Sequence, residues 1–180
     1  MDNGDKIILD LCGGTGSWSK PYKDAGYDVR LITLPENDVR LYIPPPNVYG
    51  VLAAPPCTVF ASSGARWERS QEEMIEAIGA VDACIRIITV SKPKWWALEN
   101  PIGKLVRWLG KPKMYFQPYE YGDLYTKRTA LWGNFIEPVK APIAPTEGGK
   151  IWKMAPSPDR AARRAITPQG FAKAFILANP

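Results

Sequence analysis

The stretch KIILDLCGGTG, residues 6 to 16, decides the expected fold of this chain. Its first half is a short apolar run, which is typical of a strand buried on both faces. Its second half contains three glycines, which allow positive φ angles and a close approach of the backbone to a ligand. A helix is predicted next, over residues 19 to 25, and Gly26 ends it. This order of strand, glycine turn and helix indicates a parallel sheet, in which ligands bind beyond the carboxyl ends of the strands.

Strands and helices are expected to alternate along the rest of the chain. Strands are predicted at residues 27–34, 38–42, 49–53, 95–99, 114–118 and 129–132. Helices are predicted at residues 70–90, 102–109 and 168–178. In the longest of these, Ser70 and Glu73 have the spacing of a capping box, and Ile75 belongs to an apolar stripe. Thr167 is the expected N-cap of the last helix. The alternation favours an α/β fold with a doubly wound, mostly parallel sheet.

The composition narrows the class of protein. A length of 180 residues fits one domain, 1–180, with 136–166 as a short irregular basic segment, and the net charge of +5 favours an anionic partner such as nucleic acid. Three cysteines without paired spacing fit a reducing cytoplasm. The absence of histidine excludes Ser-His-Asp and Cys-His catalysis and most zinc sites, so no metal is expected. A polar start and the lack of a long apolar run predict neither a secretion signal nor a membrane partner.

Two residues after predicted strands are candidates for chemistry. Cys57 follows a buried strand and the stiff pair Pro55-Pro56, so it is a candidate nucleophile if its surroundings lower its pKa; the alternative is a structural cysteine. Glu99 ends another apolar strand and precedes Asn100. It is a candidate acid whose pKa burial would raise, and the alternative is a cap of the next helix. Because parallel strands end at one edge of a sheet, these residues are expected near the glycine turn.

The glycine turn itself leaves two interpretations open. It is neither the dinucleotide-binding fingerprint nor a P-loop, since no Gly-Lys-Ser/Thr follows. It either binds a nucleoside-type cofactor or is a plain connection from strand to helix. Cys12, within the turn, is expected to be a small packing residue, and Cys84, within the long helix, to lie in the core.

Five motifs together resemble the cytosine-5 DNA methyltransferases. They are DLCGGTGSWS at residue 10, APPC at residue 54, LENP at residue 98, NDVR at residue 37 and YTKRTALW at residue 125. The resemblance covers residues 6 to 135 and is closest to the small phage-encoded members, which lack most of the target-recognition domain. It implies a Rossmann-like methyltransferase fold. It also implies a protein of the cytoplasm of a bacterial or phage-infected host cell.

The resemblance also implies roles for single residues. The Cys57 thiolate would add to carbon 6 of cytosine, Glu99 would hydrogen-bond N3 and the exocyclic amine, and Arg128 would be a third catalytic residue. The cofactor would be S-adenosylmethionine, with the adenine contacted by Asp38. The full set of expected cofactor-binding residues is Asp10, Cys12, Gly13, Gly14, Thr15, Gly16, Trp18, Asp38 and Pro55. The expected substrate-binding residues are Pro56, Ser62, Ser63, Asn100 and Lys127.

This chain departs from the family pattern at three places. Ala130 stands where the family has a second arginine, and Lys127 is the candidate to compensate. No acidic residue stands at the end of the second predicted strand, and Glu36 is the nearest candidate to bind the ribose hydroxyls of the cofactor. The segment 136–166 is too short for a target-recognition domain, so sequence specificity is expected to be low or to come from another protein or a homo-oligomer.

DNA is the expected partner, either as a duplex with the cytosine flipped out or as a single strand. Basic residues with interleaved aromatics suit phosphate contacts and stacking, and the alternative is a solvated charged face. Such residues occur in three groups: Lys150, Trp152, Lys153, Arg160, Arg163 and Arg164 near the C-terminus; Lys92, Lys94, Lys104 and Arg107 near Glu99; and Arg66, Trp67 and Arg69 after Cys57. Two alternatives remain: the same chemistry on RNA or free cytidine nucleotides, and a catalytically degenerate regulator that binds S-adenosylmethionine or DNA.

Overall fold

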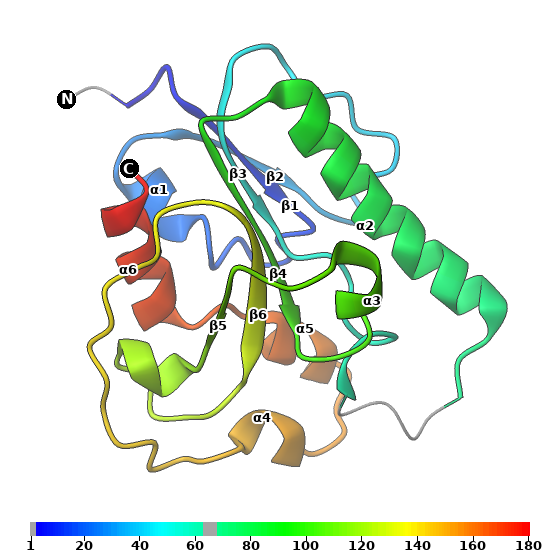
Figure 1. Cartoon of the computed structure of the whole chain (residues 1–180), viewed down its shortest axis with the longest axis vertical. Coiled ribbons are helices and arrows are strands. Elements are labelled where there is room, and N and C mark those ends of the chain that lie inside the picture. Colours follow the sequence, from blue (N-terminus) through cyan, green and yellow to red (C-terminus); the bar gives the residue numbers. More distant parts are fainter. Residues whose placement is uncertain (1–2, 63–67) are drawn as a thin grey trace.

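The computed structural model describes residues 3–62 and 68–180 of the chain. Its strands form one six-stranded sheet in the order β2-β1-β3-β4-β6-β5 (Figure 1). The strands are β1 (Ile7–Leu11), β2 (Asp28–Ile32), β3 (Val48–Ala53), β4 (Trp95–Pro101), β5 (Met114–Phe116) and β6 (Thr129–Asn134). The helices are α1 (Lys20–Asp24), α2 (Gln71–Ser91), α3 (Val106–Leu109), α4 (Lys150–Lys153), α5 (Arg160–Ala165) and α6 (Gln169–Ala178), with a 3₁₀ helix, η2, at Pro118–Tyr121.

The sheet is mixed, which corrects the expectation of a mostly parallel one. Strands β2, β1, β3 and β4 run parallel to their neighbours. Strand β6 pairs with β4 in the antiparallel sense, and β5 pairs with β6 in the same way. The sequence from β4 to β6 holds only the short elements α3, β5 and η2. Parallel neighbours need a long crossover, usually a helix, and this half of the chain does not provide one beside β4.

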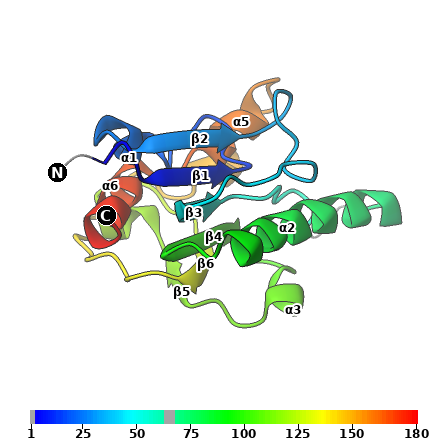
Figure 2. The same cartoon turned by 90° about the horizontal axis from the view of Figure 1, so that it is seen from above.

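Helices cover both faces of the sheet, and each face has its own core (Figure 2). One core joins α2 to the sheet through residues such as Leu9, Val51 and Leu98. The other joins α1 and α6 to the opposite face through the neighbouring positions Ile8 and Leu52. The two sets alternate along each strand, as side chains in a strand point to opposite faces in turn. The α/β class is therefore confirmed.

The long helix begins as its sequence predicts. The Ser70 side chain accepts a hydrogen bond from the Glu73 backbone N–H, and the Glu73 carboxylate accepts one from the Ser70 N–H. The predicted apolar stripe was less accurate, because Ile75 is 61% exposed. The buried face consists mainly of small residues with two isoleucines: Ala77, Ala80, Val81, Ala83, Cys84, Ile87 and Ile88. Small side chains let the helix pack closely on the sheet.

Two other expectations were wrong. Residues 38–42 form a turn rather than a strand, since the Asp38 carboxylate accepts a hydrogen bond from the Arg40 backbone N–H and stabilises the bend. The N-cap of α6 is Pro168 rather than Thr167, whose backbone N–H instead donates to the Ser17 hydroxyl. Residues 136–166 contain α4 and α5 between extended stretches. None of the described helices is both long enough and apolar enough to cross a bilayer.

A close contact joins the two central parallel strands. Gly50 of β3 lies beside Trp95 of β4 in the sheet. A Cβ atom added at Gly50 would lie 2.3 Å from the Trp95 ring, which is closer than packed atoms allow. The absence of a side chain at Gly50 therefore makes room for the indole, which packs against Tyr22 and Phe175 in the core on that face.

Candidate active site

The carboxyl ends of three adjacent parallel strands bring the predicted residues to one edge of the sheet. Strand β1 leads into the glycine turn, β3 leads into the loop with Cys57, and β4 ends with Glu99 and Asn100. Leu11 lies beside Ala53, and Ala53 lies beside Leu98. The three segments therefore leave the sheet side by side, as parallel pairing requires.

The glycine turn wraps closely around a buried carboxyl group. Asp10 is 0% exposed, and its Oδ2 accepts a hydrogen bond of 2.5 Å from the Ser19 hydroxyl. Its Oδ1 has no hydrogen-bond partner among the described residues. A Cβ atom at Gly13 would lie 2.4 Å from the Asp10 carboxyl, so the backbone can pass there only because residue 13 is glycine. Burial raises the pKa of Asp10 to about 6, although the bond from Ser19 opposes this shift.

The loop that holds Cys57 is fixed at both ends. The Asn100 side chain is buried and donates a 3.0 Å hydrogen bond from Nδ2 to the Pro55 carbonyl. Farther along, the Ser62 hydroxyl donates to the Ile102 carbonyl. Gly103 approaches the Phe60 carbonyl so closely that a Cβ atom there would lie 1.8 Å from the oxygen. These contacts attach the loop to the chain that follows β4, and Cys57 is held between the two attachments.

Glu99 and Lys127 form an ion pair next to Cys57. Lys127 Nζ lies 3.7 Å from Glu99 Oε1, and the two side chains are only 11% and 14% exposed. Nζ also donates a 3.1 Å hydrogen bond to the Arg164 carbonyl. Burial raises the pKa of the Cys57 thiol, and the negative charge of Glu99 raises it further, while Lys127 and Arg164 oppose the rise. The condition set for a nucleophilic Cys57, a lowered thiol pKa, is therefore not met by these neighbours alone.

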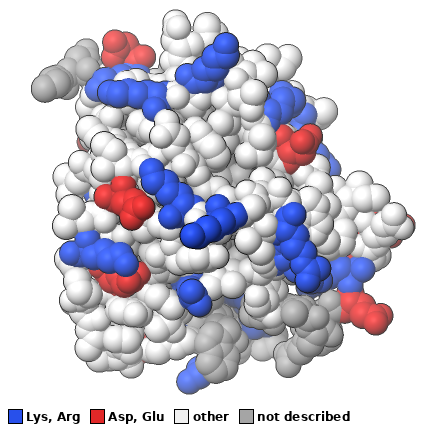
Figure 3. Space-filling view, in the orientation of Figure 1, with Lys and Arg blue, Asp and Glu red and all other residues white. Residues whose placement is uncertain are grey.

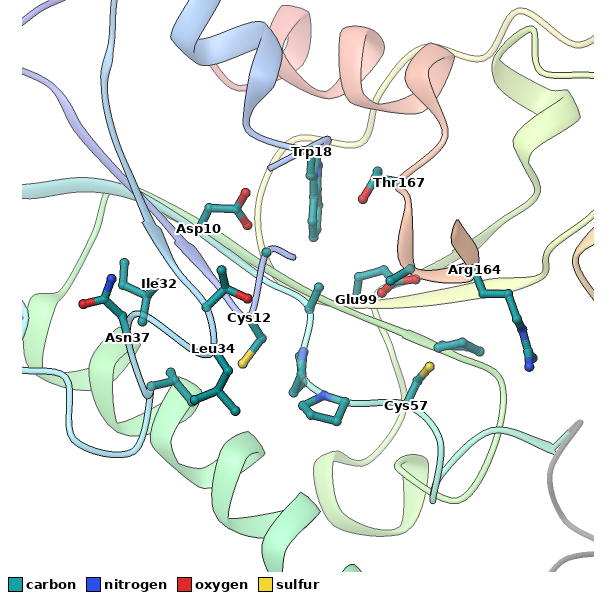
Figure 4. A pocket seen from close by; sticks show the side chains of 18 of the residues that line it. Asp10, Cys12, Trp18, Ile32, Leu34, Asn37, Cys57, Glu99, Arg164 and Thr167 are labelled. Carbon is teal, nitrogen blue, oxygen red and sulfur yellow. The ribbon is translucent and has the colours of Figure 1, made fainter. Parts of the chain in front are cut away.

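A first cavity of about 230 Å³ lies over the ends of β1, β2 and β3 (Figure 4). We call it the carboxylate cavity, since Asp10, Asp38 and Glu99 all line it. Its walls are largely apolar and include Trp18, Ile32, Leu34, Val39 and Pro55. In Figure 4, Asp10 and Asn37 lie toward one end of this cavity, and Cys57 lies toward the other. The cavity is thus an apolar slot with acidic groups along its length.

A second cavity of about 200 Å³ adjoins the first, and the described charged residues that line it are all cations. We call it the cation cavity, since its lining includes Lys127, Arg128 and Arg164 and, among the described residues, no carboxylate. Its apolar lining comes from Ala61, Pro101, Ile102 and Ile151. Cys57, Pro101, Lys127 and Arg164 line both cavities. The Cys57 thiol is therefore accessible from both.

Most of the expected site residues lie at these two cavities. The expected cofactor-binding residues that line the carboxylate cavity are Asp10, Cys12, Gly13, Trp18, Asp38 and Pro55. The expected catalytic and substrate-binding residues that line it are Pro56, Cys57, Glu99 and Lys127. Arg128 lines the cation cavity, where its guanidinium lies 5.1 Å from the centre of the Tyr115 ring.

Other expected residues lie elsewhere. Thr15 and Gly16 line a separate depression beside α1, and Gly14 adopts a positive φ of 55° in the same turn. Asn100 and Ser62 hold the Cys57 loop through the bonds given above. Ser63, Arg66 and Trp67 fall outside the described residues. Glu36 is exposed, and the Asp38 carboxylate already pairs with the Arg40 guanidinium at 2.6 Å.

The sequence places the last helix near the cofactor only through the resemblance, and it assigns neither Arg164 nor Thr167 to a site. Arg164 and Thr167 both line the carboxylate cavity, although they lie more than a hundred residues after the glycine turn. Thr167 is held there by its bond to Ser17, and Trp18 packs against Phe175 of α6 with ring centroids 5.5 Å apart. Arg164 was read only as part of a basic surface. Ala130 is buried in β6 opposite Asn100, so that position cannot present a cation to either cavity.

Comparison with known proteins finds similarity to solved structures. No protein-family model matches the chain, and no curated protein matches it. A solved structure from E. coli, described as a candidate DNA modification methyltransferase encoded within a prophage, is similar, with a TM-score of 0.53 at 15% sequence identity. The similarity covers 77% of this chain and 53% of that one, so this chain spans about half the length of its neighbour. At this identity, the similarity shows a shared fold.

Proposed function

We propose that this chain transfers a methyl group from S-adenosylmethionine to carbon 5 of cytosine in DNA. The main support is the position of Cys57 between two adjoining cavities, one lined by three carboxylates and two cations and the other lined by cations alone among the described charged residues. In this reaction the base that bonds to Cys57 must also reach the methyl group of the cofactor, so the two ligand sites must adjoin at this residue. The similar prophage protein, described as a DNA modification methyltransferase, has the same fold and adds support.

The carboxylate cavity has the donor and acceptor groups that S-adenosylmethionine needs. This cofactor has a positive sulfonium and ammonium, a carboxylate and a flat adenine. The unpaired Oδ1 of buried Asp10 and the Gly13 backbone provide a close-fitting acidic cradle. Trp18, Ile32 and Leu34 supply apolar surface for the flat ring. When bound, the cofactor supplies an electrophilic methyl group. Asp38 is held by Arg40 and contributes an oriented carboxylate at the edge of the cavity.

Cys57 performs the covalent part of the proposed reaction. Its thiolate would form a bond to carbon 6 of cytosine, and the electron pair of the C5–C6 double bond would move to carbon 5. Carbon 5 would then take the methyl group of the cofactor as the methyl–sulfur bond breaks, which leaves S-adenosylhomocysteine. A proton then leaves carbon 5 for water. The C5–C6 double bond re-forms as the carbon–sulfur bond breaks and the Cys57 thiolate departs. No metal ion takes part in this sequence.

Glu99 can act on both the Cys57 thiol and the cytosine ring. Its negative charge raises the pKa of the Cys57 thiol, so a proton on Glu99 would favour the thiolate. A protonated Glu99 can in turn donate a hydrogen bond to N3 of the ring, where negative charge builds up after thiolate addition. The thiol proton would pass to water as the thiolate forms. Lys127, 3.7 Å from Glu99, holds that carboxyl group at the junction.

The cation cavity is the proposed place for the target base. Pro101 and Ile102 offer flat apolar surface, and Arg128 stands at its edge against Tyr115. Arg128 is exposed and is the proposed contact to the substrate at this edge. Asn100 acts at one remove, because its bond to the Pro55 carbonyl sets the position of the Cys57 loop.

The decisive experiment traps the covalent adduct. In DNA containing 5-fluorocytosine, the fluorine on carbon 5 cannot leave as a proton does, so Cys57 stays bonded to the base after methyl transfer. We expect a denaturation-resistant protein–DNA complex that requires S-adenosylmethionine and is lost in Cys57→Ala. Cys84→Ala, which removes a buried thiol on α2, is the matched control and should retain the complex.

The substrate panel separates the alternatives. Duplex DNA, single-stranded DNA, RNA and free cytidine nucleotides would each be incubated with methyl-labelled cofactor. Label on DNA that depends on Cys57 supports the proposal. Label on RNA or nucleotides alone would show that these molecules, and not DNA, are the substrates of methyl transfer. Cofactor binding without transfer to any of them would contradict the enzyme proposal and favour a regulator.

A further inference from the structure

Arg164 occupies an unusual position at the junction of the two cavities. It belongs to α5, and it lines both cavities together with Cys57. Its backbone carbonyl accepts the hydrogen bond from Lys127 Nζ, so this end of α5 is attached to the ion pair beside the nucleophile. Figure 4 shows Arg164 and Cys57 toward the same end of the cavity, away from Asp10 and Asn37. The attachment uses the backbone, and the guanidinium is therefore available for another partner.

The charges around the cation cavity are unbalanced. Lys127 is compensated by Glu99. The Arg128 guanidinium lies over the Tyr115 ring, which attracts a cation without neutralising it. Within the part of the chain that the structure describes, no carboxylate pairs with the guanidinium of Arg164 or Arg128. Two uncompensated arginines at the edge of an apolar cavity complement an anionic group attached to a flat apolar one.

A nucleotide has this combination of groups. Its base would take the apolar lining of Pro101 and Ile102, and its phosphate would need a cation at the edge. Guanidinium binds phosphate through paired, charge-assisted hydrogen bonds, which makes arginine suited to this task. Basic side chains also predominate across the middle of the face seen in Figure 3, which favours an anionic partner on that face.

We propose that Arg164 binds a backbone phosphate next to the target cytosine and thereby places the base against Cys57. The inference rests on the proposed function and names a substrate contact for it. The contact comes from the segment 136–166, which sequence reasoning treated as a replacement for a recognition domain. Arg164 thus joins target positioning to the Lys127–Glu99 pair, because one residue provides a side chain to the phosphate and a carbonyl to Lys127.

The test is a double-mutant cycle between Arg164 and one phosphate. The methylated cytosine is first located by bisulfite sequencing of DNA treated with the wild-type protein. Oligonucleotides are then made with a neutral methylphosphonate at either phosphate that flanks this cytosine. Binding is measured by fluorescence anisotropy and methyl transfer in single turnovers, for the wild type, Arg164→Ala, Arg164→Lys and Lys173→Ala. Lys173 lies exposed on α6 and provides a control for loss of one positive charge.

We expect Arg164→Ala to weaken binding roughly tenfold to a hundredfold, in the range of a charged hydrogen bond. One methylphosphonate should weaken wild-type binding by a similar factor and have little further effect on the variant. Arg164→Lys should restore part of the affinity, and Lys173→Ala should resemble the wild type. Arg164→Ala should also lower the dependence of log affinity on log salt by about one unit.

Two results would overturn the inference, and they are distinguishable. Independent effects of Arg164→Ala and of both methylphosphonates would show that Arg164 does not contact a flanking phosphate, and the proposed function would remain. A wild-type protein that transfers no methyl group to DNA would overturn the proposed function and this inference with it. Circular dichroism of each variant checks that the fold is retained, as the Lys127 bond to the residue 164 carbonyl survives either substitution.

Discussion

The carboxylate cavity and the cation cavity are similar in size and share Cys57, Pro101, Lys127 and Arg164, but the rest of their linings comes largely from different parts of the molecule. The carboxylate cavity lies over the ends of the parallel strands β1, β2 and β3. The cation cavity is formed by the chain between β4 and β6 and by the C-terminal segment, where the pairing is antiparallel. Strand β1 and the segment after β2 therefore supply the carboxylates Asp10 and Asp38, and β4 supplies Glu99. The segment before β6 and helix α5 supply the cations Lys127, Arg128 and Arg164.

This difference suggests how a short chain can bring together two unlike ligands. Among the described residues, carboxylates line only one of the two cavities, and Cys57 borders both. If the comparison is correct, substitutions in the parallel half should affect a cationic ligand and the acidic groups. Substitutions in the antiparallel half should affect an anionic ligand and the Cys57 thiol. The following predictions test this division, beginning with the largest expected effect.

Glu99→Gln removes the charged group at the boundary with almost no change of shape. We expect the rate of methyl transfer in single turnovers to fall roughly a hundredfold to ten-thousandfold, because a positioned acid contributes about that much. The pKa of the Cys57 thiol should fall at the same time, since the negative charge of Glu99 no longer raises it. The rate of alkylation by iodoacetamide as a function of pH measures this shift. An unchanged rate of methyl transfer would contradict the role given to Glu99.

Asp10→Asn tests the acidic end of the carboxylate cavity. The pKa of Asp10 is raised from 3.8 to about 6, so the unfolded chain ionises first and the folded state loses stability as pH rises through this range. The loss reaches roughly 3 kcal/mol above pH 6, by the usual 1.36 kcal/mol for each pKa unit. The variant should be more stable than the wild type near pH 7 in urea unfolding, and the difference should vanish near pH 4.

The same variant should bind S-adenosylmethionine more weakly, because the buried carboxylate that faces its positive groups is gone. Asp24→Asn is the control, since Asp24 pairs with Lys20 on the exposed side of α1 and should not change the affinity. If Asp10→Asn is more stable but binds S-adenosylmethionine as tightly as the wild type, Asp10 does not belong to the proposed cofactor site.

Gly13→Ala tests the tight backbone of the glycine turn. The added methyl group would lie 2.4 Å from the Asp10 carboxyl, so either the turn or the carboxyl must move. We expect a loss of about 1–3 kcal/mol in the free energy of unfolding, as for overpacked interiors. Gly79→Ala is the matched control within α2, where an added Cβ meets no atom within 4 Å. It should be neutral or stabilise the helix by about 0.5–1 kcal/mol.

Lys127→Met tests the antiparallel half with the smallest expected effect. Lys127 opposes the rise in the thiol pKa, so its removal should move the alkylation of Cys57 to higher pH. At pH 8 we expect alkylation to slow by less than about tenfold, since a single nearby charge has a moderate influence. Lys140→Met, at an exposed ion pair with Glu120, should leave the profile unchanged. A shift to lower pH would show that Lys127 does not act on the thiol as proposed.

The parts of the site that could be predicted from the sequence lie at the ends of parallel strands. Asp10, Cys57 and Glu99 each follow an apolar run, and parallel pairing brings such positions to one edge whatever the remaining sequence. The turn at residues 12 to 16 was visible because glycines mark positive φ angles, although Cys12 also adopts one, with φ of 56°. The local sequence was sufficient to predict these features.

Features that depend on tertiary packing could not be predicted in this way. The direction of β6 depends on how the short elements after β4 return to the sheet, and no local pattern encodes it. Arg164 reaches Cys57 only because α6 packs on Trp18 and places the preceding residues over the cavities. The raised pKa of Cys57 follows from burial and from Glu99, which become its neighbours only in the folded state.

The contact between Gly50 and the Trp95 ring has a consequence for the evolution of this fold. A side chain at position 50 and an indole at position 95 cannot coexist, because the Cβ atom and the ring would occupy the same space. The two positions should therefore covary: among relatives of this chain, alanine or valine at position 50 should be accompanied by a smaller residue at position 95. A larger residue at position 50 and a smaller one at position 95 would together keep the packing between β3 and β4. The sheet edge with Cys57 and Glu99 would then stay in place while the surrounding sequence diverges.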